Sequence, residues 1–504
     1  MIEHGYIDRE DPDYIEKRNN RKLTADKIRQ ILSKVQNNPS DSAKRWVWEL
    51  MQNAKDVPNK FGRVSIQIVL SENELHFKHN GDPFSLSNIF SLIQQVSSKD
   101  SVNTDEEVTG KFGTGFISTH LLSEKIDVSG VVYHKAIHRK FTTCLDRSGR
   151  TSEEMLPKID AALEHIRNIQ NDSNFPPIVN YESIREENSF DTTFTYFLTS
   201  EEKQKAAVVG LEDLVNTLPV TLVNISKIKS VEIINSIKGI KEVYQSEVLY
   251  DDGKVKNLKV TINNSFREKT ERNFIIYSNN DVSLAVEVNN FENPILKEIS
   301  VESPRLFRDF PLIGSNKYYH PYMLNGFKFN PTEDRDGIMI HALENFEAED
   351  NRKIIESAFE ATKEFTDWLI QNNVSNKYIC AFSRLPDEKW TDFSKSWYLN
   401  LQTDYRGFLL NQPMIETDEG DIVLKEAFVP IYGSSKESRI SFYKIVKPFL
   451  GSGKVPKENI VLNWIDYTGP KDEIESWNHN IRYDIERFLG ELENLENIKN
   501  LREK

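Results

Sequence analysis

The stretch from Ser40 to Val57, SDSAKRWVWELMQNAKDV, most constrains the fold, because it predicts an amphipathic helix with a polar stripe. Glu49, Asn53 and Asp56 are spaced at i, i+4 and i+7, which gathers them on one face of an α-helix. The opposite face is apolar and carries Val47, Leu50, Met51 and Ala54. A solvent-exposed face is the ordinary explanation of such a stripe. The segments that follow favour a functional one.

Two further segments complete an ordered set. The runs RVSIQIVLS (63–71) and ELHFKHNG (74–81) alternate apolar and polar residues, as the strands of a half-buried hairpin do, and the second ends in an Asn-Gly turn. A polar stretch, 97–109, then leads into GKFGTGFISTHLLS (110–123), where three glycines precede an apolar helical pattern. Glycines let the backbone approach a ligand closely, and the N–H groups of a helix start favour an anion such as phosphate.

This set of an acid and amide helix, an Asn-Gly turn after a strand and a glycine-rich loop resembles the Bergerat-fold ATPases. That superfamily, GHKL, includes the ninety-kilodalton heat-shock chaperones, MutL, MORC proteins, type II topoisomerases and histidine kinases, and the chain is particularly similar to the sacsin-like ATPase domains. The resemblance implies an α/β chain that begins with a two-layer α+β sandwich at residues 1–200, with a lid at 97–109. A mixed α/β, transducer-like domain would follow at 201–345, and an α-rich region with short strands at 346–504.

The resemblance also implies ATP and Mg²⁺ as cofactors and gives roles to the residues that match its motifs. Glu49 would be the general base that orients water, and Asn53 would bind a magnesium ion that bridges the phosphates. Asp56 and Lys60 would lie behind the nucleotide. Thr192, in the strand-like run DTTFTYFL, would help to hold the adenine through water. The glycine-rich segment would wrap the phosphates with Gly110, Lys111, Phe112, Gly113, Thr114, Gly115 and Phe116.

One motif departs from the family pattern. The family usually places an aspartate two residues before the glycine of the strand-end turn, where it accepts a hydrogen bond from the adenine amino group. This chain has His79, Asn80 and Gly81 there, and Pro83 replaces the second glycine. A neutral histidine nitrogen can accept a hydrogen bond, so His79 could take the place of the aspartate; a structural histidine at a strand end is the alternative.

A basic residue of the second domain reaches the terminal phosphate in the resembling ATPases. The loop-rich stretch 305–338 contains segments that recur in sacsin-like proteins, which makes Arg335 the favoured phosphate sensor and Lys328 the second candidate. A guanidinium group suits a planar, bidentate hold on phosphate oxygens better than an ammonium group does. The alternative is that both residues are surface charges beside a turn.

Composition limits the class of protein. The 504 residues suggest two to four domains, and 38% hydrophobic residues are typical of a folded chain. The 78 acidic residues exceed the 64 basic ones, which disfavours wholesale binding to a nucleic-acid backbone. Cys144 and Cys380 are far apart and predict no disulfide framework, as in a reducing cytosol. We find no uninterrupted apolar run of about 18 residues, so no membrane span is predicted and a cytoplasmic location is expected.

These observations give three hypotheses for the function. The first is a slow ATPase that acts as a chaperone-like conformational switch on protein partners, as a homodimer when ATP is bound. The second is an ATP-gated nucleic-acid clamp of the MutL or MORC kind, which a lysine cluster weakly supports (Lys227, Lys229, Lys238 and Lys241). The third is a histidine kinase, but only His4 precedes the predicted ATPase module and no long dimerisation helix carries a phosphoacceptor histidine.

Overall fold

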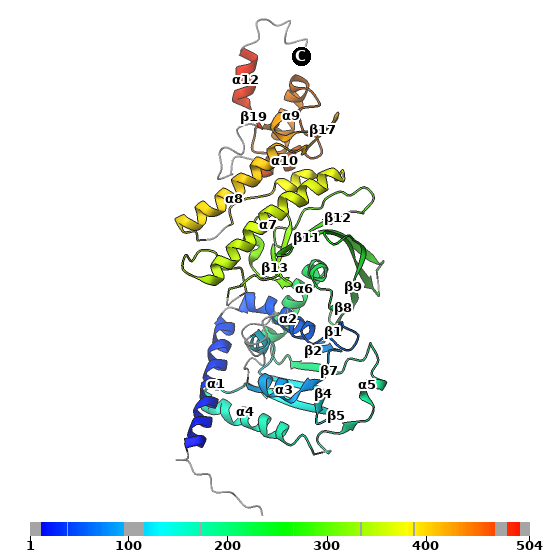
Figure 1. The fold of residues 1–504 in the computed structure, drawn as a ribbon, viewed down its shortest axis with the longest axis vertical. Coiled ribbons are helices and arrows are strands. Elements are labelled where there is room, and N and C mark those ends of the chain that lie inside the picture. The colour runs from blue at the N-terminus through cyan, green and yellow to red at the C-terminus, as the bar shows by residue number, and fades with distance from the viewer. Residues whose placement is uncertain are drawn as a thin grey trace, which may run out of the picture. The chain divides into compact units, whose positions relative to one another are not determined.

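The computed structural model describes residues 12–37, 39–94, 115–171, 173–265, 267–332, 335–386, 389–468 and 481–493 (Figure 1). The protein is mixed α/β, as predicted. Its chain divides into two compact units, and each is described by itself. The first unit comprises Met1–Ser246 and Val260–Glu271, and the second comprises Glu247–Lys259 and Arg272–Lys504.

The first unit contains a mixed sheet and the helices that pack on it. Its helices are α1 (Pro12–Asn37), α2 (Pro39–Lys55), α3 (Leu86–Gln94), the 3-10 helix η1 (Gly115–Leu121), α4 (Ser152–Arg167), α5 (Tyr181–Ile184) and α6 (Glu201–Asn224). Its strands are β1 (Val64–Leu70), β2 (Glu74–His79), β3 (Phe84–Ser85), β4 (Lys125–His134), β5 (Ile137–Asp146), β6 (Pro177–Ile178), β7 (Thr192–Phe197), β8 (Ile228–Asn235) and the first part of β9 (Ile240–Asp251).

The strands follow the order β6-β5-β4-β7-β2-β1-β8-β9, and β3 pairs with β4. Most neighbours are antiparallel, while β1 with β8 and β3 with β4 are parallel. The predicted hairpin is confirmed, because β1 and β2 pair antiparallel with Ile66 opposite His79. The predicted strand at 191–198 is β7, which pairs with β2 on the other side.

The predicted helix at 40–57 is confirmed as α2, and burial separates its two faces as expected. Val47, Met51 and Ala54 are fully buried, whereas Asn53 is exposed. The apolar face packs on α6, where the side chain of Trp46 donates a hydrogen bond to the carbonyl oxygen of Ala206 at 3.3 Å. Gly210 makes this close approach possible, because a Cβ atom there would overlap the Trp46 ring.

Helix α6 and strand β8 belong to the first unit, although the sequence boundary at residue 200 assigned both to the second domain. Strands β7 and β8 run in the same direction within one sheet, as their pairings through β2 and β1 require. Parallel strands need a crossover connection, usually a helix, and α6 supplies it. Residues 201–235 therefore complete the first sheet.

Within the described residues, α6 is the one helix that is long and apolar enough to cross a membrane by length and composition alone. In its most apolar window, 67% of the residues are buried inside the structure. Leu211, Leu214 and Leu218 are almost fully buried. Helix α6 thus has the burial of a core helix.

The predicted helix after the glycine-rich loop differs from expectation in type. Residues 115–121 form η1, a 3-10 helix of seven residues, instead of an α-helix. The hydroxyl groups of Ser118 and Thr119 donate to the carbonyl oxygens three residues earlier, each at 2.7 Å. Such side-chain bonds compete with the α-helical pattern.

The second unit continues the chain with strands first and helices later. The strands are the remainder of β9, β10 (Val255–Asn264, shared with the first unit), β11 (Thr270–Ser278), β12 (Val282–Val288), β13 (Leu306–Arg308), β14 (Phe310–Pro311), β15 (Met323–Gly326), β16 (Ile415–Thr417), β17 (Gly420–Ile422), β18 (Val429–Ile431) and β19 (Arg482–Asp484). The helices are η2 (Ser315–Lys317), α7 (Phe346–Gln371), η3 (Lys377–Ala381), α8 (Asp392–Leu410), η4 (Leu424–Glu426), α9 (Lys436–Leu450), α10 (Val461–Thr468) and α12 (Ile485–Glu493).

A buried polar chain runs through the core of the second unit. The hydroxyl of Tyr322 bonds to that of Thr366 at 2.6 Å, and the hydroxyl of Tyr405 donates to the carbonyl oxygen of Cys380 at 2.7 Å. His320 joins the chain through a bond between its Nδ1 and the carbonyl oxygen of Tyr322 at 2.9 Å, and its Nε2 bonds to the hydroxyl of Thr362 at 3.0 Å. Burial lowers the pKa of His320 to about 4. Each polar group buried in this chain therefore has a partner, as a stable core requires.

Candidate functional site

The first pair of predicted site residues lies together where α2 meets η1. Gly115, the first residue of η1, lies against the side chain of Glu49 on α2. A Cβ atom at position 115 would overlap the Glu49 carboxylate, so any other residue there would displace this side chain. The last glycine of the glycine-rich segment and the predicted general base are thus neighbours.

The polar stripe of α2 continues beyond Glu49. Glu49 and Asp56 are half-buried, and the side chain of Asn53 between them is exposed. An amide oxygen is a hard ligand of the kind that Mg²⁺ accepts, and Mg²⁺ sites commonly use one or two protein ligands together with phosphates and water. Within the described part of the chain no group of three or more His, Cys, Asp or Glu residues could hold a metal. A magnesium ion bound at Asn53 would receive most of its ligands from a phosphate and from water.

Most of the predicted phosphate-binding segment lies outside the described residues. This holds for the predicted lid at 97–109 and for Gly110, Lys111, Phe112, Gly113 and Thr114. Phe116 is described and is buried. Its ring contacts the rings of Phe194 at 5.5 Å and His120 at 6.2 Å between centroids. Phe116 thus anchors the start of η1 to strand β7.

The two residues predicted to lie near the base are neighbours in the sheet. His79 ends β2 and Thr192 begins β7, and they stand directly opposite each other in the antiparallel pairing. Directly opposed residues have side chains on the same face of the sheet. Both are buried, and the imidazole of His79 stacks on the ring of Phe194.

His79 is a hydrogen-bond donor at its second nitrogen. Burial, with a contribution from Arg185, lowers its pKa to about 3, so the ring is neutral. Its Nδ1 accepts a hydrogen bond from the N–H of Gly81 at 3.1 Å, which leaves the proton on Nε2. The sequence hypothesis gave His79 the acceptor role of the family's aspartate. This tautomer does not supply that acceptor; it can donate to a ring nitrogen or a carbonyl oxygen of a base.

Asn80 and Gly81 have clear packing roles in the turn. The Asn80 side chain accepts from the N–H of Ser65 at 2.6 Å and donates to the carbonyl oxygen of Glu187. A Cβ atom at Gly81 would lie 2.5 Å from the carbonyl oxygen of Val57, just after α2. Asn80 therefore joins the end of β2 to β1, and Gly81 lets the turn pack closely against the end of α2.

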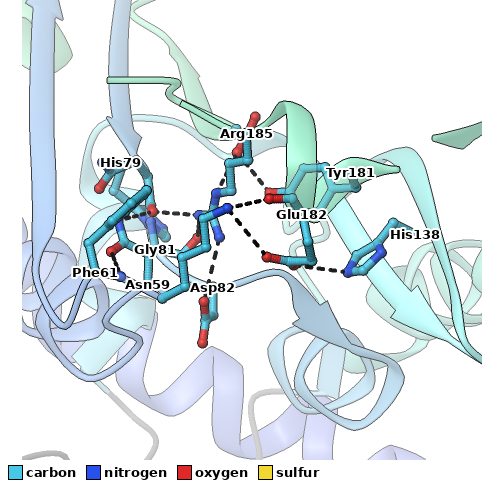
Figure 2. A network of polar contacts seen from close by, with 12 residues as sticks. Asn59, Phe61, His79, Gly81, Asp82, His138, Tyr181, Glu182 and Arg185 are labelled. Atoms are coloured by element: carbon cyan, nitrogen blue, oxygen red, sulfur yellow. Dashed lines mark hydrogen bonds and ion pairs between the residues drawn. The ribbon is translucent and has the colours of Figure 1, made fainter. Parts of the chain in front are cut away.

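Arg185 holds this turn in place, and sequence reasoning missed it (Figure 2). Its guanidinium donates to the carbonyl oxygens of Asn80, at 2.6 Å, and Gly81. Asp191 receives an ion pair at 3.2 Å and Asp82 a weaker one at 3.5 Å. The arginine side chain is only 1% exposed. An arginine in a polar loop gives no sequence signal of such a role, because the contact depends on residues about a hundred positions apart.

Lys60 lies beside the same network. Its ammonium group donates to the carbonyl oxygen of Glu182, and the Glu182 carboxylate lies 4.0 Å away. The carboxylate also pairs with His138 at 3.4 Å, whose ring lies on that of Tyr181 (Figure 2). Lys60 thus contacts the short helix α5, and its predicted position behind the nucleotide stays a prediction.

The predicted phosphate sensors belong to the second unit. Arg335 has a φ of 52°, and its N–H donates to the carbonyl oxygen of Thr332 at 2.9 Å. The hydroxyl of Thr332 also donates to the carboxylate of Asp336 at 2.5 Å. Lys328 is exposed. The sensor role of either residue stays a prediction.

The lysine cluster that supports a nucleic-acid clamp is largely neutralised by acidic neighbours. Lys229 pairs with Glu187 at 2.8 Å, and Lys241 pairs with Glu232 at 2.9 Å. Lys238 pairs with Glu212. Phosphate backbones attract unneutralised cations, so these pairs weaken the case for nucleic acid.

No protein-family model matches this chain, and a comparison with curated proteins finds no similar one. Function is therefore inferred from the residues themselves and from their geometry.

Proposed function

We propose that the first unit binds ATP with magnesium and hydrolyses it slowly, in a nucleotide site of the Bergerat type. The observation that carries this proposal is the packing of Gly115 against the Glu49 carboxylate. It brings the predicted general base to the end of the glycine-rich segment, although the two lie far apart in sequence. The adjacent ends of β2 and β7 supply a second wall, with His79 and Thr192 side by side.

In this proposal Glu49 orients the attacking water and accepts its proton, and Asn53 supplies the protein ligand of the metal. Magnesium, when bound, would neutralise charge on the phosphates. The rigid packing of α2 on α6 holds both residues in fixed positions, because their apolar neighbours Val47 and Met51 are fully buried. A fixed carboxylate needs little rearrangement when charge develops on the water.

In this site the nucleobase would be recognised by a hydrogen-bond donor, where the resembling family uses an acceptor. The Nε2–H of His79 fits a ring nitrogen of adenine, and it also fits a carbonyl oxygen such as that of guanine. The donor therefore fits either purine. Comparing the dissociation constants of ADP and GDP by calorimetry tests the selectivity directly, and tighter binding of GDP would correct the identity of the base.

The proposed biological role rests on the resemblance to sacsin-like proteins. We propose a chaperone-like switch on protein partners, cytoplasmic and dimeric when ATP is bound, as the resembling sacsin-like proteins imply. A nucleic-acid clamp is the weaker alternative, because three of its four candidate lysines are paired with carboxylates.

The decisive experiment is the Glu49→Ala variant. We expect ATP binding with magnesium to be retained and hydrolysis to fall at least a hundredfold, on the order of the effect of losing a positioned general base. Glu72→Ala is the matched control, since Glu72 is an exposed glutamate in the same unit. Equal loss of binding and hydrolysis would remove Glu49 from the role of base.

A second variant tests the metal ligand. Asn53→Ala should weaken ATP binding only when magnesium is present, because the amide contacts the metal and not the nucleotide. Titration of ATP with and without magnesium measures this. An unchanged magnesium dependence would take Asn53 out of the metal site.

A further inference from the structure

A cavity of about 370 Å³ in the first unit shares no residue with the candidate nucleotide site. Its polar lining comes from α1, η1 and the segments flanking β4 and β5, and includes Arg29, Ser33, His120, Glu124, Arg147 and Arg150. Small-molecule sites usually enclose roughly 300 to 1,000 Å³. The cavity is therefore large enough for a small organic ligand.

The lining is strongly basic. The charged residues of the lining are three arginines and a single carboxylate, that of Glu124, so positive charge prevails. Arg29 and Arg150 are exposed, and within the described residues no ion pair involves their side chains. Unpaired guanidinium groups that converge on one cavity suit the oxygens of a phosphate or carboxylate group.

Two buried side chains at the cavity have polar atoms that no group in the described part of the chain satisfies. Arg147 is 3% exposed and His120 is 5% exposed. The Nε atom of Arg147 and the Nε2 atom of His120 are buried without a hydrogen-bond partner among the described residues. Buried polar atoms are normally paired, so unpaired ones beside a cavity point to a missing ligand or to water.

The tautomer of His120 narrows the ligand further. Its Nδ1 lies 3.0 Å from the carbonyl oxygen of Ser123, an atom that can only accept, so Nδ1 carries the proton. Burial lowers the pKa of His120 to about 3, which keeps the ring neutral. Nε2 is thus a hydrogen-bond acceptor to which no described residue donates.

We propose that this cavity binds a small oxyanion of the phosphate class that also carries an O–H donor, either free hydrogenphosphate or a hydroxylated phosphate ester. The arginines take the negative oxygens, and Nε2 of His120 accepts the O–H. Sulfate matches the charge and shape of hydrogenphosphate but has no O–H. The cavity should therefore prefer phosphate to sulfate.

The experiment uses the whole chain without nucleotide or magnesium, so that its failure leaves the ATPase proposal untouched. Isothermal titration under mildly alkaline conditions compares inorganic phosphate, sulfate and glycerol phosphate. We expect phosphate to bind at least about tenfold more tightly than sulfate, because sulfate leaves Nε2 unsatisfied. Tighter binding of glycerol phosphate than of inorganic phosphate would identify an organic ligand, and the reverse order would identify the free anion.

Variants then assign the binding to this cavity. Arg29→Ala and Arg150→Ala remove exposed side chains and should each weaken phosphate binding about tenfold. Arg167→Ala is the matched control, because Arg167 is an exposed arginine of the same unit that pairs with Glu164. His120→Phe keeps a ring in place and should bring the affinities for phosphate and sulfate together.

Three results would overturn the proposal. Absence of phosphate binding by the wild-type chain would mean that the cavity holds only water. Phosphate binding that is equal in the wild type, Arg29→Ala and Arg150→Ala would place the anion elsewhere. Equal affinity of the wild type for phosphate and sulfate would remove the O–H donor from the ligand.

Discussion

Two buried arginines of the first unit differ in how completely their guanidinium nitrogens are paired, and this difference separates a structural role from a functional one. Arg185 uses all three of its guanidinium nitrogens on carbonyl and carboxylate oxygens around the turn after β2. Arg147 donates to the carbonyl oxygens of Ile93 and Asp146, but its Nε has no partner among the described residues. A fully paired buried arginine holds a fold together, whereas an incompletely paired one at a cavity is available to a ligand.

The energetics support this comparison. Burial of a charged group is costly unless partners replace the lost water. Removal of a fully paired buried arginine is therefore expensive, because its partners are left buried without it. Burial lowers the pKa of Arg147 to about 10, which shows how poorly its surroundings compensate its charge. The same contrast predicts opposite responses to mutation.

The largest effect is expected for Arg185→Met. Removal of the guanidinium takes the donor away from the carbonyl oxygens of Asn80 and Gly81 and leaves the Asp191 carboxylate with the Tyr181 hydroxyl. Breaking a buried pair from one side costs about 3 to 5 kcal/mol. The free energy of unfolding, measured in urea, should fall by that amount. Arg167→Ala is the control and should stay within about 0.5 kcal/mol of the wild type. A similar small loss for both variants would show that the network is not structural.

A second prediction compares His79, beside Arg185, with His120, beside Arg147. Burial lowers both pKa values from 6.5 to about 3. Below about pH 6.5 the histidine of the unfolded chain takes up a proton, whereas the buried histidine of the folded chain stays neutral. The contribution of each histidine to the free energy of unfolding is therefore complete above that pH and is lost as the pH falls towards 3. Between pH 7 and pH 5 each histidine should remove about 2 kcal/mol of stability.

The His79→Gln and His120→Gln variants test this. Each should show about 2 kcal/mol less change in unfolding free energy between pH 7 and pH 5 than the wild type does. At about pH 8 both rings are neutral in the folded and unfolded chain, so the difference measured there gives the structural cost alone. Identical pH dependence in wild type and variants would contradict the buried, neutral state of the rings.

Elements with a local repeat could be predicted from the sequence. The i, i+4, i+7 stripe predicted α2, and the alternating runs around Glu72-Asn73 predicted the β1–β2 hairpin. The helix type after the glycine-rich segment could not be predicted, because the hydroxyl bonds of Ser118 and Thr119 that accompany η1 depend on rotamers. The boundary near residue 200 differed from the compact units because parallel pairing of β8 with β1 leaves no local signal.

The candidate site divides in the same way. The resemblance implies that Glu49 and the glycine-rich segment belong to one site, and Gly115 lies against Glu49 in the structure. The catalytic roles of these residues stay predictions. Whether His79 offers a donor or an acceptor could not be predicted, since its tautomer depends on the position of a single N–H group, that of Gly81. The two arginines could not be told apart either, because pairing of a guanidinium is a property of distant segments that meet only in the folded chain.

The smallest effect, and the sharpest test of the comparison, is expected for Arg147→Met. Methionine fills a similar volume with an unbranched apolar chain, and it removes a charge that burial disfavours, at the expense of two hydrogen bonds to carbonyl oxygens, one of them long at 3.4 Å. These opposing terms should leave the free energy of unfolding within about 1 kcal/mol of the wild type. Arg185→Met, the same substitution at an equally buried site, should cost several times more.

Inorganic phosphate adds a second measurement on Arg147→Met. Excess ligand stabilises the state that binds it, by about 2.7 kcal/mol at a hundred times the dissociation constant. That gain should appear in the wild type and largely vanish in Arg147→Met. A large loss of stability in Arg147→Met without phosphate would mean that its guanidinium is structural after all, and that the unpaired Nε does not mark a ligand site.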